Sequence, residues 1–97
     1  MEGFDEIIHQ SARLQIMAAL NALDDDSQME FSALRELLGL TDGNLATHLR
    51  KLEEAGYVAV EKTFVGRRPR TYLSLTPQGR QAFANHVRAL REIIGSA

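Results

Sequence analysis

The 97-residue sequence contains no cysteine, which excludes disulfides, thiolate zinc sites and thiol redox switches. No apolar run approaches the roughly eighteen residues that a membrane span requires. Residues 1–6 are acidic, whereas a secretory signal opens with a basic stretch. We therefore expect a cytoplasmic protein with no membrane partner, and the length predicts a single domain over residues 1–97.

The sequence also lacks the residue clusters that catalysis and metal binding require. His9, His48 and His86 fall in three different predicted elements, and none has a second ligand three or four positions further on. Residues 24–26 are consecutive aspartates, but they lack the spaced acids and terminal glutamate of a calcium loop. No serine has a neighbouring base with an orienting acid. We expect no enzymatic activity, no metal site and no bound cofactor.

Charge is distributed unevenly along the chain, although the formal net charge is only −2. Residues 1–42 carry two basic and nine acidic side chains, a net charge of −7. Residues 43–80 carry seven basic and three acidic side chains, a net charge of +4. Because local sign decides which face attracts a polyanion, the second segment is the one suited to nucleic acid. The acidic segment would discourage binding through the wrong side.

Apolar residues recur at helical spacing in four segments, residues 11–23, 33–38, 42–55 and 77–94. The clearest case is the third, in which Leu45, Leu49 and Leu52 stand at i, i+4 and i+7. Ser32 is expected to cap the second helix, and Thr76 the fourth. The first helix is apolar on more than one side, so we expect it to be buried on more than one side.

A β-hairpin is predicted between the third and fourth helices. Residues 57–64 are rich in strand formers, and residues 71–75 are the expected partner strand. Gly66 and Pro69 between them are turn residues, and proline disfavours further pairing there. Residues 29–31 are too short for an independent strand but could add an edge to the hairpin.

This order of elements predicts an α+β, mostly α, winged helix-turn-helix fold. It has a recognition helix over about 42–55, a two- to three-stranded antiparallel wing over 57–75 and a C-terminal helix over 77–94. The sequence resembles the MarR-like winged-helix transcriptional regulators, and most of all their small one-domain relatives, although it lacks the long extra N-terminal helix of full-length members. The segments that carry the resemblance are residues 12–17, 40–58 and 66–79.

The predicted recognition helix presents polar side chains away from its leucine stripe. Asparagine can bond adenine through two hydrogen bonds, threonine can reach a base or a phosphate, and a glycine allows a close approach to a backbone. The alternative is a solvated helix face that contacts nothing. The predicted DNA-contacting residues of this segment are Thr41, Gly43, Asn44, Thr47, His48, Arg50 and Lys51.

Three arginines crowd the predicted hairpin tip. Arg67, Arg68 and Arg70 lie within four positions, and Lys62 is near on the rising strand. Bringing these cations together requires a counter-charge, which a phosphate backbone or a narrow minor groove supplies. The resemblance implies the same role for the wing. The alternatives are a solubilising tip and, for Arg70 alone, an ion pair with an acid at the hairpin base.

The apolar residues of the last helix exceed what one small core is expected to absorb. This surplus predicts a homodimer, which the resemblance also implies, over a palindromic site with half-sites about 34 Å apart. The alternative is packing within one subunit. The predicted interface residues are Ile7, Ile8, Phe83, Val87, Leu90 and Ile94.

These features together predict a sequence-specific regulator of transcription that binds double-stranded DNA as a homodimer. A winged-helix adaptor that binds a protein partner is the competing class, and the basic tip distinguishes the two because an adaptor does not need it. A third hypothesis adds a small-molecule effector at the dimer interface, whose identity the sequence does not indicate.

Overall fold

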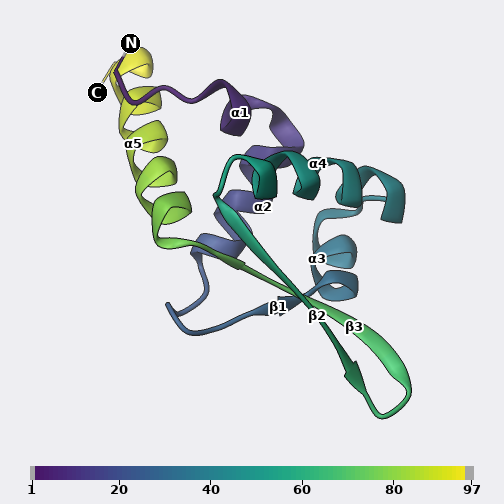
Figure 1. The fold of residues 1–97 in the computed structure, drawn as a ribbon. Coiled ribbons are helices and arrows are strands. Elements are labelled where there is room, and N and C mark those ends of the chain that lie inside the picture. Colours follow the sequence, from purple (N-terminus) through teal and green to yellow (C-terminus); the bar gives the residue numbers. More distant parts are fainter. Residues whose placement is uncertain (1, 96–97) are drawn as a thin grey trace.

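The computed structural model describes residues 2–95, and Figure 1 shows their fold. The elements follow the predicted order of a winged helix, with a short extra helix at the N-terminus. They are α1 (Glu6–His9), α2 (Ser11–Asn21), β1 (Met29–Glu30), α3 (Phe31–Leu38), α4 (Asp42–Glu54), β2 (Val58–Val65), β3 (Arg68–Leu75) and α5 (Pro77–Ile94). The predicted fold class is confirmed.

Helix α2 is the centre of the helical body, since it contacts the other four helices and strand β3. Its side chains Ile16, Met17 and Leu20 are completely buried, as expected for a helix that is apolar on more than one side. Helix α4 lies across it with its predicted leucine stripe turned inward. Leu45 and Leu52 of that stripe have no exposed surface.

The turn between α3 and α4 is fixed by local backbone chemistry. Gly39 has φ of +66°, the left-handed conformation that commonly ends a helix. Thr41 then caps α4, because its side-chain oxygen accepts the Asn44 N–H at 3.1 Å. Arg35 of α3 bonds the Asp42 carboxylate at 2.7 Å, so an ion pair closes the turn.

The predicted cap at Ser32 is wrong. Helix α3 begins two residues earlier than predicted, at Phe31, and its N-cap is Glu30 in extended conformation, whose side chain accepts no capping hydrogen bond. The reason is that Glu30 pairs with Tyr72 in the sheet, so the chain passes directly from strand into helix. Sheet pairing, which the sequence shows only weakly at this point, sets the helix boundary.

The sheet has the order β1-β3-β2 with antiparallel pairing throughout. The hairpin is longer than predicted, because Val65 pairs with Arg68 and Phe64 pairs with Pro69. Its turn is formed by two residues, and Gly66 has the positive φ that a type II′ turn requires at its first central position. Pro69 is tolerated because β1 does not extend beside it, so β3 has an open edge there.

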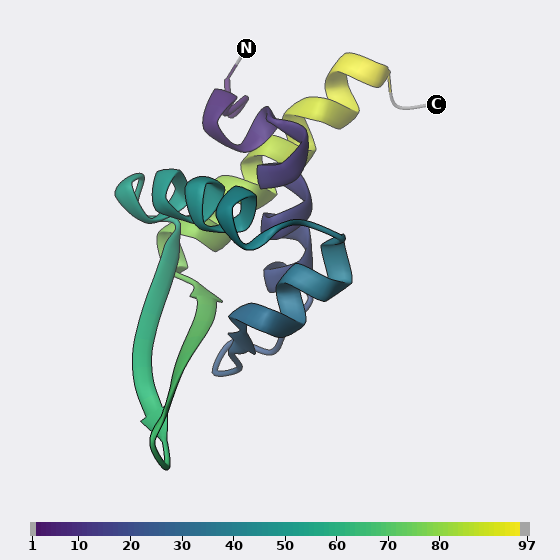
Figure 2. The same cartoon turned by 90° about the vertical axis from the view of Figure 1, so that its right-hand side faces the viewer.

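The wing formed by β2 and β3 projects from the helical body as a narrow arm, which both views show (Figures 1 and 2). The molecule measures 51 × 25 × 23 Å along its principal axes.

Helix α5 follows the wing, and its N-cap Thr76 accepts the Gly79 N–H at 2.9 Å. This predicted cap is confirmed, with Pro77 in the first turn. The arm and α4 together offer a partner two separate elements to bind.

Candidate nucleic-acid interface

The side of α4 opposite the leucine stripe is polar and exposed. Gly43, Asn44, Thr47 and Arg50 all lie on the surface. A Cβ atom added at Gly43 would meet nothing within 4 Å, so this part of the helix is open to a close approach. The Thr47 hydroxyl donates to the Gly43 carbonyl at 2.9 Å and keeps its oxygen lone pairs as acceptors. These four residues, all among the predicted DNA contacts, share one exposed face of α4.

His48 lies elsewhere than the sequence predicts. It is half-buried, and its Nδ1 stands 3.2 Å from the Arg13 guanidinium of α2. Because arginine can only donate, Nδ1 accepts and the neutral ring carries its proton on Nε2. Burial lowers the pKa of His48, and the nearby Arg13 and Lys51 charges lower it further. His48 therefore helps to hold α4 against α2 and does not belong to the exposed face.

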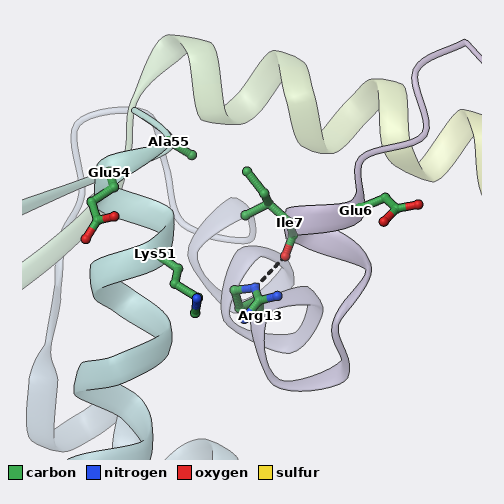
Figure 3. A pocket seen from close by; sticks show the side chains of 6 residues that line it. All are labelled: Glu6, Ile7, Arg13, Lys51, Glu54 and Ala55. Carbon is green, nitrogen blue, oxygen red and sulfur yellow. Dashed lines mark hydrogen bonds between the residues drawn. The ribbon is translucent and has the colours of Figure 1, made fainter.

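Lys51, in the last turn of α4, also lies on the side of the helix that faces α1 and α2. It borders an open cavity of about 430 Å³ that lies between α4 and the first two helices (Figure 3). Ile7 and Arg13 form the opposite wall, and Arg13 Nε donates to the Ile7 carbonyl at 2.5 Å. The two predicted contacts His48 and Lys51 are thus on a different side of α4 from Arg50.

A groove of about 250 Å³ separates α4 from the wing. Arg50 lines it from the helix and Lys62 from β2, so two predicted cations from distant parts of the chain border one space. Neither forms an ion pair with a carboxylate in the part of the chain that the structure describes. Glu53 lines the same groove from the C-terminal half of α4. The groove therefore joins the helix and the wing into one surface.

The arginines of the wing divide into two kinds. Arg67 in the turn and Arg68 at the start of β3 are exposed and have no carboxylate partner within residues 2–95. Arg70 pairs instead with Glu30 at 3.4 Å, which supports the ion pair that the sequence analysis held open for it. Within the part of the chain that the structure describes, Arg67 and Arg68 therefore keep their charges available for a partner at the tip.

The apolar surface of α5 is partly exposed in the single chain. Ile94 is 80% exposed, and Phe83, Val87 and Leu90 are partly buried. Ile8, however, is completely buried in the core of the subunit, so its prediction as a dimer contact is wrong. The short helix α1 turns this side chain inwards, and the neighbouring Ile7 outwards with 40% exposure.

A hydrogen-bonded cluster that was not predicted from the sequence ties the N-terminal segment to α5 and to Tyr57, directly before the wing. The Asp5 N–H donates to His86 Nδ1 at 3.0 Å, and Tyr57 donates its hydroxyl to the Asp5 carboxylate. That bond and burial raise the pKa of Tyr57 to about 12. The rings of Phe4 and His9 pack beside His86, which is completely buried. No spacing rule connects residues this far apart in the sequence.

Within residues 2–95, no helix is both long and apolar enough to cross a membrane. Over the same residues, no group of three histidine or acidic side chains lies close enough together to hold a metal ion.

Comparisons with known proteins agree with this geometry. The profile of a family described as winged helix DNA-binding domain matches residues 12–94. The chain is 42% identical over 82 residues to the uncharacterized protein MJ0432 of Methanocaldococcus jannaschii, covering 84% of this chain and 86% of that protein.

Solved structures show the same fold. A transcriptional regulator homologue from Pyrococcus horikoshii OT3 is similar with a TM-score of 0.83 and 32% identity, over 93% of this chain and 86% of that one. The transcriptional repressor CouR, solved bound to a 23-mer DNA duplex, shares the fold with a TM-score of 0.66 at 22% identity. That similarity covers 97% of this chain and 74% of the CouR chain. The resemblance to winged-helix regulators is confirmed, and the chain belongs to the family of winged helix DNA-binding domains.

Proposed function

We propose that this chain acts as one domain that regulates transcription by binding double-stranded DNA sequence-specifically as a homodimer. Helix α4 enters the major groove, and the wing binds the flanking backbone or minor groove. The observation that carries the proposal is the groove between α4 and the wing, where Arg50 and Lys62 border the same space and form no ion pair with any of residues 2–95.

This groove suits the sugar-phosphate strand that separates a major groove from the adjacent minor groove. A phosphate there would neutralise Arg50 and Lys62 together and release counterions. Asn44 and Thr47 would then face base edges from the exposed side of α4. Glu53, which lines the groove beyond Arg50, and Glu54 next to it would repel phosphates. The strand therefore lies at the Arg50–Lys62 part of the groove, and the duplex meets α4 through its N-terminal half.

The homodimer is proposed from the apolar surface of α5. Phe83 and Val87 border an open depression of about 440 Å³ on this helix, and Ile93 and Ile94 beyond it are more than half exposed. A second copy of α5 would cover this surface and set two recognition helices about one helical turn, roughly 34 Å, apart. Such a dimer would bind a palindromic site.

The test is a titration of the purified chain against a randomised duplex pool at several salt concentrations, followed by selection and sequencing of the bound DNA. We expect salt-sensitive binding and an enriched palindrome. Arg50→Ala and Lys62→Ala should each weaken binding and reduce the salt slope by about 1. Arg88→Ala removes the same charge outside the groove, on the α5 depression proposed to be covered in the dimer. It should leave the slope unchanged at protein concentrations at which sedimentation equilibrium shows the variant to be a dimer.

The other outcomes separate the competing hypotheses. Salt-sensitive binding without an enriched motif would contradict sequence specificity for the chain alone, and the selection would then be repeated in the presence of candidate small-molecule effectors. No binding at low salt would contradict DNA binding and favour the adaptor that docks a protein through its apolar surface.

A further inference from the structure

The tip of the wing carries an exposed aromatic side chain. Phe64 is 70% exposed, although a phenylalanine is ordinarily buried in a soluble protein. Its cross-strand neighbour Pro69 is also exposed, and the two face each other directly across the hairpin. Together they form an apolar patch, here called the tip patch, that the other residues within 2–95 leave uncovered.

The tip patch lies on the side of the wing that faces α4. Side chains alternate between the two faces of a strand, so Phe64 shares a face with Val60 and Lys62. Those two residues line the groove between α4 and the wing. Phe64 therefore continues that wall of the groove outwards, whereas the adjacent Val65 lies on the opposite face and is 55% exposed.

The charges around the tip patch favour a polyanion as its partner. Residues 62–71 contain four basic side chains and no acidic one. Of these four, only Arg70 is paired with a carboxylate within the described residues. A protein partner that covered Phe64 would have to match Lys62, Arg67 and Arg68 with acids, whereas DNA offers phosphates beside the apolar edges of its sugars.

We propose that the tip patch is a DNA contact of its own, in which Phe64 and Pro69 pack against the deoxyribose edges of the strand that the groove holds. The inference rests on the proposed DNA binding and adds an apolar, sequence-independent component to it. Apolar packing against sugars displaces no phosphate counterions, so its contribution to affinity does not depend on salt.

Two substitutions separate this component from the charges. Phe64→Ala should weaken binding about tenfold at every salt concentration, as expected for losing a covered aromatic ring, and leave the salt slope unchanged. Val65→Ala on the opposite face is the matched control and should bind like the unmodified chain. Thermal melting of both variants checks that the hairpin is intact.

A direct measurement uses the absence of tryptophan from the chain. Phe64→Trp places a single fluorophore in the tip patch, and Val65→Trp places one on the other face. On adding a duplex that the chain binds, the indole at position 64 should shift its emission to the blue and become protected from acrylamide, and that at position 65 should stay accessible.

Failure of this inference differs from failure of the proposed function. If the unmodified chain binds DNA, as shown by the anisotropy of a labelled duplex, but Phe64→Ala binds equally well and the introduced indole stays accessible, the tip patch is not a DNA contact and is free for a protein partner. If the unmodified chain binds no duplex at any salt concentration, the proposed function and this inference both fall.

Discussion

At the scale of single residues, the basic side chains of this protein divide by what they contact. Arg35 bonds Asp42, Arg70 pairs with Glu30, and Arg80 pairs with Asp25 at 3.4 Å while donating to carbonyls of the loop after α2. These arginines hold elements of one subunit together. An arginine that stabilises the fold has carboxylate or carbonyl partners within the subunit, whereas one that is available to bind a partner molecule is exposed and lacks them.

Arg68 illustrates the second kind, since it is exposed and has no carboxylate partner in the described chain. Arg68→Ala should weaken DNA binding to a similar extent across sequences and lower the salt slope by about 1, because one phosphate contact is lost. Titration of specific and random duplexes at several salt concentrations measures both effects. An unchanged slope would remove Arg68 from the interface.

Asn44 should behave in the opposite manner. It is exposed on the N-terminal half of α4, where a recognition helix contacts base edges. Asn44→Ala should relax base preference at one position of each half-site and leave the salt slope as it was. Sequencing of selected duplexes gives the comparison, and an unaltered preference would show that α4 does not read bases through this residue.

His86 makes stability depend on pH. Burial lowers the pKa of His86, and the neighbouring His9 lowers it further, while Asp5 acts in the opposite direction. Stability is complete above the ordinary histidine pKa of about 6.5, where the ring is neutral in both states. As the pH falls below that value the unfolded chain binds the proton first, so the free energy of unfolding decreases until the lowered folded pKa is reached.

Thermal melting between pH 7.5 and pH 5.5 tests this. His86→Asn keeps an acceptor for the Asp5 N–H but does not titrate, so its melting temperature should fall less over this range. His48 contributes to the pH dependence of the melting temperature in both proteins, because its pKa is also lowered, mainly by burial. Equal slopes in the two proteins would show that His86 does not titrate in this way.

At the scale of elements, the joint between the wing and α5 depends on a close backbone approach. A Cβ atom added at Gly79 would stand 2.1 Å from the Tyr57 carbonyl oxygen, which itself accepts the Thr76 N–H at 3.0 Å. A side chain cannot occupy that position unless the start of α5 moves away from the end of α4. The glycine thus determines how the two helices meet at the base of the wing.

Gly79→Ala should destabilise the fold by about 3 kcal/mol, at the upper end of overpacking costs. Gly43→Ala is the matched control, since it also lies in a helix but has open space around it. It should stabilise the fold by about 0.5 to 1 kcal/mol, because alanine loses less backbone entropy on folding. Chemical unfolding measures both, and a tolerated Gly79→Ala would contradict the close approach.

The elements themselves could be predicted from the sequence because their signals are local. The leucine stripe of α4 and the Thr76 cap lie within a few residues of the elements they define. The predictions were wrong where a strand or helix distant in the sequence determines the local conformation or burial. Glu30 caps α3 because it pairs with Tyr72, and Pro69 stays in β3 because β1 ends before reaching it. Ile8 is buried because α1 packs against helices far along the chain.

The candidate site could be predicted in part. Residue types and the turn indicated a polar helix and a basic tip, but the sequence does not show which direction each side chain takes. His48 and Arg70 have internal partners that lie 35 and 40 positions away in the chain. Phe64 is exposed because it lies one pair from the end of a hairpin that is longer than predicted.

At the scale of the whole molecule, the apolar face of α5 is proposed to join two copies. Ile94→Glu should raise the dissociation constant of the dimer about tenfold or more, because a buried, unpaired carboxylate is unfavourable. Leu37→Glu is the control, since Leu37 is 63% exposed but lies on α3. Sedimentation equilibrium gives the mass of each, and a monomeric unmodified chain would contradict the dimer.

The hairpin closes through Gly66 and Arg67 alone, so every residue of β2 has one fixed partner in β3. One residue inserted in each strand would preserve that pairing but exchange the two faces beyond it, and Phe64 would turn away from α4. Only insertions of two residues per strand keep both the pairing and the faces. Related winged helices whose wings differ in length but keep the same faces should therefore differ by about four residues, or a multiple of four, counted over the two strands together.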